Sequence, residues 1–379
     1  MTRSDGAVLL TGATGFVGME LLARYLERTE RPILTVVRAD SEEGARERID
    51  AVLANLFGDR AGRHADRVTA LAGDLTAPGL GLGRKSSDLL AAEATMIVHC
   101  AASVSFGLSL EQSRAINLEG TRRMLELAGR AQERGVLERY AQVSTAFVAG
   151  THPGRFHECD LDVGQSFHNS YEQSKFESEQ LVRSWGGRDP LPYTILRPSI
   201  VVGDRNSGWT AAFNVLYWPL RALARGLFPA VPAIPSSPVD VVSIDYVADG
   251  IYELCESSDG IRQTYHLTAG NRASTIAEIA ELASAYFQQP LPRLLSPAEF
   301  MAADHGVPRS LLEEGAMYFP YFSGTTTFDD AMSRAELDPA GIGVTPLREY
   351  MSRLLDYATW ARWGKHPIPR AEAAAYAGA

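Results

Sequence analysis

Short apolar runs alternate with longer amphipathic segments over the first 200 residues of this chain. The runs that are typical of strands lie at 7–10, 33–37, 68–74, 96–101, 139–145 and 193–199. Segments with helical periodicity lie between them, at 16–29, 111–134 and 170–185 among others. Strands that alternate with helices of this length form βαβ units, in which helices cover both faces of a parallel sheet. The alternation therefore predicts an α/β fold with a doubly wound parallel sheet.

The alternation breaks after residue 204, because 205–235 carry glycine, proline and bulky aromatic residues. A strand and helix pattern returns over 236–289, and the residues beyond it are rich in proline, tyrosine and phenylalanine. We therefore expect 1–204 and 236–289 to form a nucleotide-binding domain, and 205–235 and 290–365 to form a smaller, discontinuous substrate-binding lobe. Residues 366–379, which end in "AEAAAYAGA", are expected to be a flexible tail.

Composition excludes several classes of function. The formal net charge is −10, which argues against nucleic acid as the main partner. Cys100, Cys159 and Cys255 are too few and too scattered for a disulfide framework or a zinc site, so we expect no metal and a cytoplasmic location. No apolar run approaches the ~20 residues that span a membrane, so no membrane span is expected. The oligomeric state stays open.

The first predicted strand runs directly into "TGATGFVG", and an amphipathic segment follows. Gly12, Gly15 and Gly18 have the Gly-x-x-Gly-x-x-Gly spacing, which permits a tight turn and a close approach of a pyrophosphate to the backbone. A helix that begins near Phe16 would direct free N–H groups at the phosphates. This loop predicts a dinucleotide site on a Rossmann-type sheet.

The residue after the second predicted strand bears on which nicotinamide cofactor binds. An acid there accepts the ribose hydroxyls of NAD, whereas a cation accepts the 2′-phosphate of NADP. Arg38 occupies this position, and its guanidinium suits a phosphate. Arg48, on the following helix, could assist. Asp40 is close enough to keep NAD as an alternative, but the arginine favours NADP.

Four polar residues suggest a reaction centre. In "YEQSK", Tyr171 and Lys175 lie four residues apart, so a helix would place both side chains on one face. A cation beside a phenol favours the phenolate and would lower its pKa, which makes Tyr171 a candidate proton donor or acceptor. Thr145 ends a predicted strand and would add a second hydroxyl for an oxyanion. Asn117 lies inside a helix without a capping role.

Taken in order, these motifs resemble the extended short-chain dehydrogenase/reductase family over about residues 7–285. The set comprises "TGATGFVG", Asp74 in "AGDL", "HCAAS", Asn117, Thr145, "YEQSK" and "LRPSIVVG". The resemblance implies that Tyr171 is the acid/base, that Lys175 holds the nicotinamide ribose and tunes Tyr171, that Thr145 polarises a carbonyl and that Asn117 supports Lys175 through water. It also implies a cofactor site that adds the following residues to the glycines and arginines: Thr11, Thr14, Phe16, Val17, Asp74, Leu75, Ala101, Ala102, Ser103, Pro198, Ser199 and Ile200.

Longer stretches narrow the resemblance to one branch. "IVHCAASVSFGLSLEQSRAINLEGTRRMLELA", "VSTAFVAG" and "LRPSIVVGDRNSGW" are similar to fatty acyl-CoA reductases and to terminal thioester reductase domains, the branch with a male-sterility-type nucleotide-binding domain. This resemblance implies NADPH-dependent reduction of an acyl thioester, carried by CoA or an acyl carrier protein, to an aldehyde or onward to an alcohol. The alternative enzyme is a dehydrogenase or epimerase that acts on a secondary alcohol, such as a hydroxysteroid or nucleotide sugar. A nucleotide sensor without catalysis would not need Thr145, Tyr171 and Lys175 together.

In this setting, segment 211–228 suggests a cover for the substrate. Its apolar residues recur at helical spacing, and Arg221 and Arg225 lie beside them, four residues apart. We expect one helix whose apolar face lines an acyl channel and whose arginines contact the phosphate of the thioester arm. Cys100, at the end of the fourth predicted strand, is expected to be a small core residue.

Overall fold

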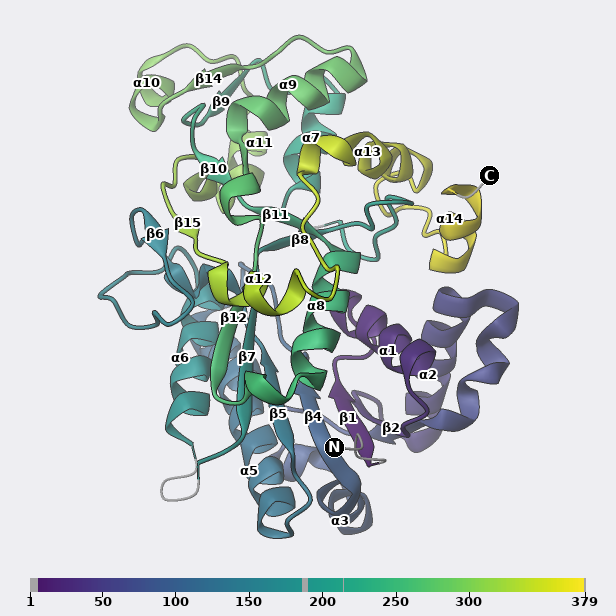
Figure 1. Ribbon diagram of the computed structural model, residues 1–379. Helices are drawn as coiled ribbons and strands as arrows, with labels where there is room; N and C mark the ends of the chain where they lie inside the picture. Colours follow the sequence, from purple (N-terminus) through teal and green to yellow (C-terminus); the bar gives the residue numbers. More distant parts are fainter. Residues whose placement is uncertain (1–5, 186–189, 214, 378–379) are drawn as a thin grey trace.

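A seven-stranded sheet forms the centre of the computed structural model, which describes residues 6–185, 190–213 and 215–377 (Figure 1). All paired neighbours in this sheet are parallel, and the strand order is β12-β7-β5-β4-β1-β2-β3. The strands are β1 (Ala7–Thr11), β2 (Ile33–Val37), β3 (Val68–Ala72), β4 (Ala94–His99), β5 (Arg139–Val143), β7 (Tyr193–Pro198) and β12 (Gln263–Leu267). The predicted α/β fold with a parallel, Rossmann-type sheet is confirmed.

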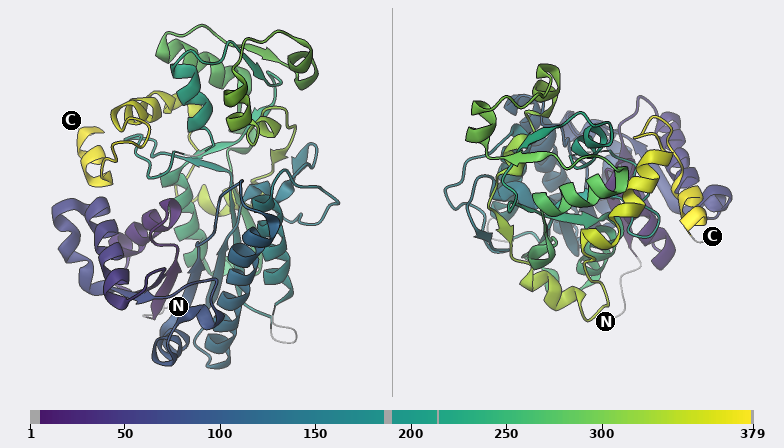
Figure 2. Two further views of the ribbon diagram at one scale, coloured as in Figure 1. Left: turned by 180° about the vertical axis from the view of Figure 1, so that it is seen from behind. Right: turned by 90° about the horizontal axis from the view of Figure 1, so that it is seen from above.

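Helices cover both faces of the sheet, as the two opposite views also show (Figures 1 and 2). One face carries α1 (Phe16–Arg28), α2 (Glu42–Phe57), α8 (Ile244–Glu256) and α12 (Ala331–Leu337), and the other carries α3 (Arg84–Glu93), α5 (Glu119–Glu133) and α6 (Ser170–Ser184). Successive residues of β1 alternate between the two cores, because Val8 and Leu10 pack under α1 and Leu9 packs on the opposite face. Both faces of the strand are therefore buried, which explains its unbroken apolar sequence.

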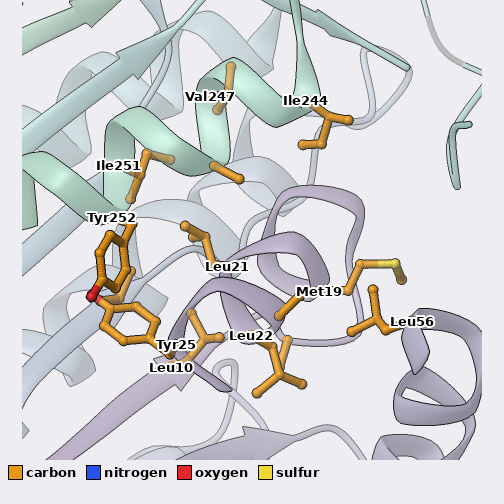
Figure 3. Close-up of a cluster of buried hydrophobic side chains, with 14 of the residues drawn as sticks. Leu10, Met19, Leu21, Leu22, Tyr25, Leu56, Ile244, Val247, Ile251 and Tyr252 are labelled. Carbon is orange, nitrogen blue, oxygen red and sulfur yellow. The ribbon is translucent and has the colours of Figure 1, made fainter. Parts of the chain in front are cut away.

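On one face of the sheet, helices α1 and α8 pack against each other more extensively than any other pair of described helices (Figure 3). Leu21, Leu22 and Tyr25 of α1 face Ile251 and Tyr252 of α8, and the two tyrosine rings meet edge to face with their centroids 5.2 Å apart. Apolar residues at this helical spacing bury one stripe of α1 and hold its first turn against the sheet. The first turn of α1 is the part that borders the nucleotide loop.

The chain enters α5 through an irregular helix. Ser109 caps α4 (Leu110–Ser113) through a capping box with Gln112, and residues Arg114–Leu118 form one π-helical turn before α5. A π turn inserts an extra residue and rotates the side chains beyond it, and such turns often occur at functional sites. Here the turn carries Asn117.

Most of the remaining chain packs above the sheet in the view of Figure 1, and we call these elements the second lobe. They are α7 (Tyr217–Ala224), β9 (Ala230–Pro232), α9 (Ile276–Phe287), β14 (Arg293–Leu295), α10 (Pro297–Ala302), α11 (Arg309–Gly315), the 3₁₀ turn Phe319–Phe322 and α13 (Met351–Trp360). Short strand pairs connect the lobe to the sheet domain: β8 (Ile200–Val202) with β11 (Val241–Ser243), β10 (Pro238–Val239) with β13 (Ser274–Thr275), and β6 (Arg155–Phe156) with β15 (Thr327–Phe328).

Two helices pack with the domain to which the sequence did not assign them. Helix α9 falls within the predicted nucleotide-binding range 236–289 but packs against α7 of the second lobe. Helix α12 falls within the predicted substrate-lobe range 290–365 but packs against β12 and α8. The division of the chain into two domains stays a prediction, with this exchange of elements.

The predicted helix over 211–228 is shorter in the structure. Helix α7 covers only Tyr217–Ala224, and Asn214 lies outside the described residues. Pro219 falls in the first turn of α7, where a missing N–H is tolerated. Gly226, at φ +65°, turns the chain after the helix.

The predicted flexible tail is wrong for most of its length. Residues Arg370–Ala377 form α14, which packs against α2, and Ile368 and Ala373 are buried in the core under α1. The Arg370 guanidinium lies 2.7 Å from the buried Glu20 carboxylate, which Arg24 also contacts at 2.9 Å. A buried carboxylate needs cationic partners, and this need holds the segment in place. Residues 378 and 379 lie outside the described chain.

No helix in the described part of the chain is long and apolar enough to cross a membrane.

Removing the second cation from Glu20 should destabilise the fold. We expect Arg370→Ala to lower the free energy of unfolding by about 1–3 kcal/mol, because the buried Glu20 carboxylate loses a charged partner. Urea unfolding followed by circular dichroism measures this change. The matched control is Arg309→Ala, which breaks an exposed Arg309–Glu313 pair and should change stability by less than ~0.5 kcal/mol. Equal effects of the two substitutions would show that α14 is not anchored by Glu20.

Candidate active site

A cavity of about 540 Å³ runs along the carboxyl ends of the strands from β3 to β7. Open parallel sheets place their ligands at this edge, where the connections diverge on either side of β1 and β4. The cavity wall contains most of the predicted site residues: Gly12, Thr14, Gly15, Phe16, Val17, Gly18, Arg38, Arg48, Asp74, Leu75, Ala101, Ala102, Thr145, Tyr171, Lys175, Pro198, Ser199 and Ile200.

Three predicted site residues do not line the cavity. The Thr11 hydroxyl is buried, bonds to His99 Nδ1 at 2.8 Å and accepts the N–H of Ala101 at 3.3 Å. Asn117 accepts the N–H of Ser103 at 2.8 Å, and its amide nitrogen donates to the Ser103 carbonyl at 3.1 Å. Thr11, Ser103 and Asn117 therefore hold the loop after β4 from behind.

Asn117 also reaches α6, one residue before Lys175, and its support of Lys175 through water stays a prediction. Its amide nitrogen donates to Ser174 Oγ at 2.9 Å, whereas the Lys175 ammonium donates to the carbonyl of Val143 at 2.8 Å. No direct bond joins Asn117 to Lys175 in the described chain. The π turn thus ties α5 to α6 one residue before Lys175.

The glycine loop fits closely against the end of β4. Gly12 has φ +76°, and a Cβ at this position would lie 2.7 Å from the backbone nitrogen of Ala101. A Cβ on Gly18 would lie 2.0 Å from the carbonyl oxygen of Gly12. Helix α1 begins after Gly15 without a side-chain cap, so its first N–H groups remain available to a ligand. The loop therefore has the geometry of a pyrophosphate cradle.

Arg38, Arg48 and Asp74 surround the far end of the cavity. Arg48 reaches back from α2 to the carbonyl of Arg38 and to Thr14 Oγ1. The Asp74 carboxylate accepts the N–H and the hydroxyl of Thr76, each at 2.8 Å, and these bonds, with the nearby Arg38 charge, lower its pKa. Asp40 does not line the cavity. Within the described residues, the exposed Arg38 guanidinium has no ion pair and is available to an anion.

Thr145 and Tyr171 meet beside the end of β5. Thr145 follows β5 and caps a short 3₁₀ turn (Ala146–Ala149), because its hydroxyl accepts the N–H of Phe147 at 3.2 Å. Tyr171 lies in the first turn of α6, which Asn169 caps, and its phenol faces the same cavity as the nearby Thr145 hydroxyl. Lys175 lies one turn further along α6 on the same side. The predicted grouping of Thr145, Tyr171 and Lys175 is thus present in the structure.

The direction of the Tyr171 pKa differs from the prediction. Burial raises the pKa of Tyr171 to about 12, which the nearby Thr145 hydroxyl only partly offsets, and the neighbouring Glu172 raises it further. Burial also lowers the pKa of Lys175 to about 8. The desolvation of the phenol outweighs the expected help from the lysine. At neutral pH Tyr171 keeps its proton and can donate it to a developing oxyanion.

Aromatic residues that the sequence did not single out form the wall beside Tyr171. The Phe106 ring centroid lies 6.1 Å from that of Tyr171 and 5.8 Å from that of Tyr321, and Phe147 contacts Tyr321 edge to face at 5.5 Å. Val104 and Val215 extend this apolar surface. Phe106 and Phe147 lie inside the stretches "IVHCAASVSFGLSLEQSRAINLEGTRRMLELA" and "VSTAFVAG", but no pattern there marks them as wall residues. Tyr321 comes here only through tertiary packing.

Tyr321 is fixed to the start of α6 by hydrogen bonds. Its hydroxyl donates to Glu172 Oε1 at 2.5 Å and accepts from Asn169 Nδ2 at 2.7 Å. The fully buried Glu172 carboxylate also accepts the N–H of His168 at 2.8 Å, and it raises the pKa of the His168 imidazole. A residue of the second lobe is therefore anchored next to the catalytic tyrosine.

The apolar face of α7 does not line the active site, contrary to the prediction. Leu220 and Leu223 pack with α9, α13 and β11 inside the second lobe, and among the described residues of the predicted segment only Ala212 and Val215 border the cavity. Arg221 and Arg225 have no ion pair within the described residues, and their contact with a phosphate stays a prediction.

Cys100 lies directly after β4, where it packs partly buried against the core under α1 and also borders the cavity. Burial raises the pKa of its thiol to about 12, so the thiol stays protonated and is a poor nucleophile. No cluster of three or more potential metal-binding side chains occurs among the described residues.

Comparison with known proteins agrees with this geometry. Residues 10–251 match the sequence family described as "Male sterility protein", with an NAD-binding domain. The terminal R domain of the myxalamid PKS-NRPS pathway is 28% identical and has a TM-score of 0.81, with coverage of 97% of this chain and 94% of that one. A UDP-glucuronic acid 4-epimerase from Bacillus cereus, at 17% identity and a TM-score of 0.67, shares the fold over 95% of this chain and 98% of its own.

Curated relatives are longer proteins. A carboxylic acid reductase from Mycobacterium marinum is 30% identical over 69% of this chain and 24% of its own length. An isonitrile lipopeptide synthase from Streptomyces coeruleorubidus is 34% identical over 59% of this chain and 15% of its own length. The chain spans about a quarter, or less, of the length of these relatives.

The fold and the grouping of Tyr171, Lys175 and Thr145 define an oxidoreductase of the extended short-chain dehydrogenase/reductase type that binds a nicotinamide dinucleotide. Within that class, the chain belongs to the male sterility protein family, since the match covers more than half of its residues. The resemblance to the thioester reductase branch is confirmed.

The pKa of Lys175 leads to a pH prediction for cofactor binding. Because the ammonium loses its proton as the pH rises through about 8, the affinity for NADPH should fall above this pH, by up to about tenfold per pH unit. Tyr171, with its pKa at about 12, stays protonated over this range. Fluorescence titration of NADPH at a series of pH values measures the change. Lys175→Met should bind more weakly and show a flat profile, and an equal decline in that variant would assign the titration to another group.

Proposed function

We propose that this protein uses NADPH to reduce an acyl thioester, held by CoA or by the phosphopantetheine arm of an acyl carrier protein, to an aldehyde. The observation that carries the proposal is the pair of hydroxyls on Thr145 and Tyr171, which open onto an apolar, aromatic wall. Family membership and the likeness to the myxalamid R domain support it. A second reduction to the alcohol is compatible with the same residues. The cytoplasmic location expected from the cysteine content stays a prediction.

The residues present fit a nicotinamide dinucleotide. Gly12 and Gly18 let the loop lie tightly between the end of β4 and the start of α1, since a Cβ at either position would clash with main-chain atoms of Ala101 or Gly12. The first N–H groups of α1 stay available to a pyrophosphate. Lys175, buried at 3% exposure, has donors left to hold the nicotinamide ribose after its bond to Val143. When bound, the cofactor supplies a hydride to the thioester carbonyl carbon.

Residues of this chain bind the thioester carbonyl oxygen and transfer the proton to and from it. Thr145 and Tyr171 donate hydrogen bonds to the carbonyl oxygen, and these strengthen as negative charge develops on it. Tyr171 then transfers its proton to this oxygen. When the carbon–sulfur bond breaks, the Tyr171 phenolate takes the proton back from the hydroxyl, and the sulfur leaves as a thiol after gaining a proton from solvent. The Lys175 ammonium stabilises the phenolate during its short life.

Arg38 supports NADPH over NADH. Its guanidinium has no ion pair in the described chain and sits beyond β2, where a 2′-phosphate would lie. Among the nearby acids, Asp40 does not line the cavity, and Glu42 is occupied by the N–H of Ala72 at 2.9 Å.

The alternative, oxidation or epimerisation of a secondary alcohol, has less support. A nucleotide sugar needs several polar groups around it, but the wall beside Tyr171 is formed by Val104, Phe106, Phe147 and Val215. The likeness to the epimerase is at 17% identity and concerns the fold alone.

A substrate panel tests the proposed reaction. With NADPH, we expect acyl-CoA and acyl-pantetheine thioesters to be reduced with release of thiol, while sterols and UDP-sugars give no turnover with NADP⁺. Tyr171→Phe should lower kcat by about a hundredfold or more, since the proton donor is lost, with NADPH affinity unchanged. Absorbance of NADPH, thiol release and product identification by mass spectrometry provide the measurements. Turnover of alcohols without any turnover of thioesters would exclude the proposal.

Cofactor preference has its own prediction. We expect NADPH to bind at least about tenfold more tightly than NADH, which is ~1.4 kcal/mol. Arg38→Ala should remove most of this difference by weakening NADPH alone, whereas Arg60→Ala, on the 3₁₀ turn after α2 and outside the cavity, should leave it intact. Isothermal titration with both cofactors measures the ratio. Equal affinities in the wild type would refute the assignment of Arg38.

A further inference from the structure

Asp240 carries a buried carboxylate that the proposed reaction does not use. It links β10 to β11, where the sheet domain meets the second lobe (Figure 1), and is 7% exposed. Its two carboxylate oxygens accept the N–H groups of Ala269 and Gly270 at 2.7 and 2.9 Å, and no ion pair joins it to a cation in the described part of the chain. A buried charge without a cationic partner is costly, and such groups concentrate at functional sites.

The titratable groups that face Asp240 in the described chain are all acidic. They are Asp330 ahead of α12, Tyr246 on α8 and Tyr350 ahead of α13. Burial raises the pKa of Asp240 to about 6, which the hydrogen bonds it accepts only partly offset, and the Asp330 charge raises it further. Gly270 has φ +53°, and a Cβ there would lie 2.8 Å from Asp330 Oδ2, so the two carboxylates face the same turn.

The Pro198–Ile200 segment separates Asp240 from the catalytic cavity, which the segment borders. The N–H of Ile200 donates to the main-chain carbonyl of Asp240 at 3.2 Å, and the N–H of Ser199 donates to the carbonyl of Leu267 at 3.2 Å. A proline has no N–H. The backbone of this segment therefore has no N–H left for a ligand.

The Ser199 hydroxyl is the polar side-chain group of this segment. It lines the cavity, is 7% exposed and has no hydrogen bond within the described residues. It lies near enough to the Asp240 carboxylate to lower the pKa of that carboxyl. An ionised carboxylate can only accept a hydrogen bond, so the hydroxyl proton turns toward Asp240 and the oxygen lone pairs are left for a donor in the cavity.

We propose that Asp240 is a positioning residue for the nicotinamide cofactor and that it acts through Ser199. With its proton turned to Asp240, the Ser199 oxygen accepts an N–H of the nicotinamide carboxamide. This inference rests on the proposed function and extends it from the class of cofactor to the orientation of its reactive ring. A fixed carboxamide fixes the rotation of the ring, and hence the face that is turned toward Thr145 and Tyr171.

Cofactor analogues that differ only at the carboxamide test this contact. The acetylpyridine analogue of NADP⁺ keeps the carbonyl but has no N–H at this group, whereas the thionicotinamide analogue keeps its NH₂. At about pH 7.5, NADP⁺ and the thionicotinamide analogue should bind about five- to tenfold more tightly than the acetylpyridine analogue, because only they donate to Ser199. Isothermal titration measures the three affinities. Equal affinities would overturn the inference.

The preference for the carboxamide should require ionised Asp240. When the pH falls through about 6, the carboxyl gains a proton and can donate to Ser199, which leaves the Ser199 proton free to turn to the cavity. The preference should then shrink to within about twofold at about pH 5, far from the titration of Lys175 near 8. Asp240→Asn, whose amide donates to Ser199 without titrating, should show this small preference at every pH. An undiminished preference at low pH, or in Asp240→Asn, would contradict the role of Asp240.

Ser199→Ala should remove the preference by weakening NADP⁺ alone. Ser237→Ala is the matched control, because its hydroxyl is also buried without a hydrogen bond in the described chain but does not border the cavity. A merely structural role of Ser199 would weaken all three cofactors equally and keep their ratio, which would refute the contact. Ser144 also has a buried hydroxyl without a partner at the cavity. Loss of the preference in Ser144→Ala, with its retention in Ser199→Ala, would equally overturn the assignment.

These titrations contain no thioester, so they separate the inference from the proposed function. A preference that depends on Ser199, in a protein that reduces no thioester, would leave the contact standing and remove the reaction. Thioester reduction together with equal binding of the three cofactors would support the reaction and remove the role of Asp240.

Discussion

The buried hydrogen bond from the Lys175 ammonium to the Val143 carbonyl joins the sheet to α6. The grouping of Thr145, Tyr171 and Lys175 depends on this bond. A lysine at 3% exposure is costly, because its charge loses its hydration, and this cost lowers its pKa to about 8. The bond fixes α6 against the end of β5. Because Tyr171 lies on α6 and Thr145 directly follows β5, the same bond sets the distance between these two residues. The lysine therefore sets the position of the tyrosine and hydroxyl as well as part of their electrostatics.

Most of the sheet and the nucleotide loop could be predicted from the sequence, because their signals are local. The loop of Gly12 requires a residue without a Cβ, and β1 is buried on both faces, so each pattern allows few alternatives. The direction of the Tyr171 pKa could not be predicted, because it depends on burial by Phe106 and on the charge of Glu172 rather than on spacing. Two helices were assigned wrongly for a related reason. The apolar face of α7 shows helical periodicity, but periodicity does not say which surface a helix covers. The alanine-rich sequence of α14 has no clear apolar stripe that would predict its packing on α2.

Tyr321 joins the second lobe to α6, so the lobe does not pack independently of the sheet domain. Its hydroxyl shares the buried Glu172 with His168, and Glu172 follows Tyr171 directly on α6. Any displacement of the 3₁₀ turn Phe319–Phe322 would leave a buried carboxylate with one partner fewer, which is costly. The substrate wall and the proton donor are therefore held in one arrangement by a hydrogen bond between residues 149 positions apart.

The cavity is chemically divided along its length, and this division narrows the chemistry it can perform. Its cofactor end has free backbone N–H groups, two arginines and a hydrogen-bonded Asp74, whereas its other end has aromatic and aliphatic walls. The hydroxyls of Thr145 and Tyr171 lie where these two ends of the cavity meet. A substrate bound there has one oxygen that can be stabilised and an apolar remainder, which describes an acyl carbonyl far better than a polyhydroxylated ring. The aromatic contacts that continue from Phe106 through Tyr318 to Trp218 extend this apolar character into the second lobe. In the proposed reaction, the carbonyl chemistry depends on the residues at the end of β5 and the start of α6, and the apolar wall contacts the remainder of the substrate.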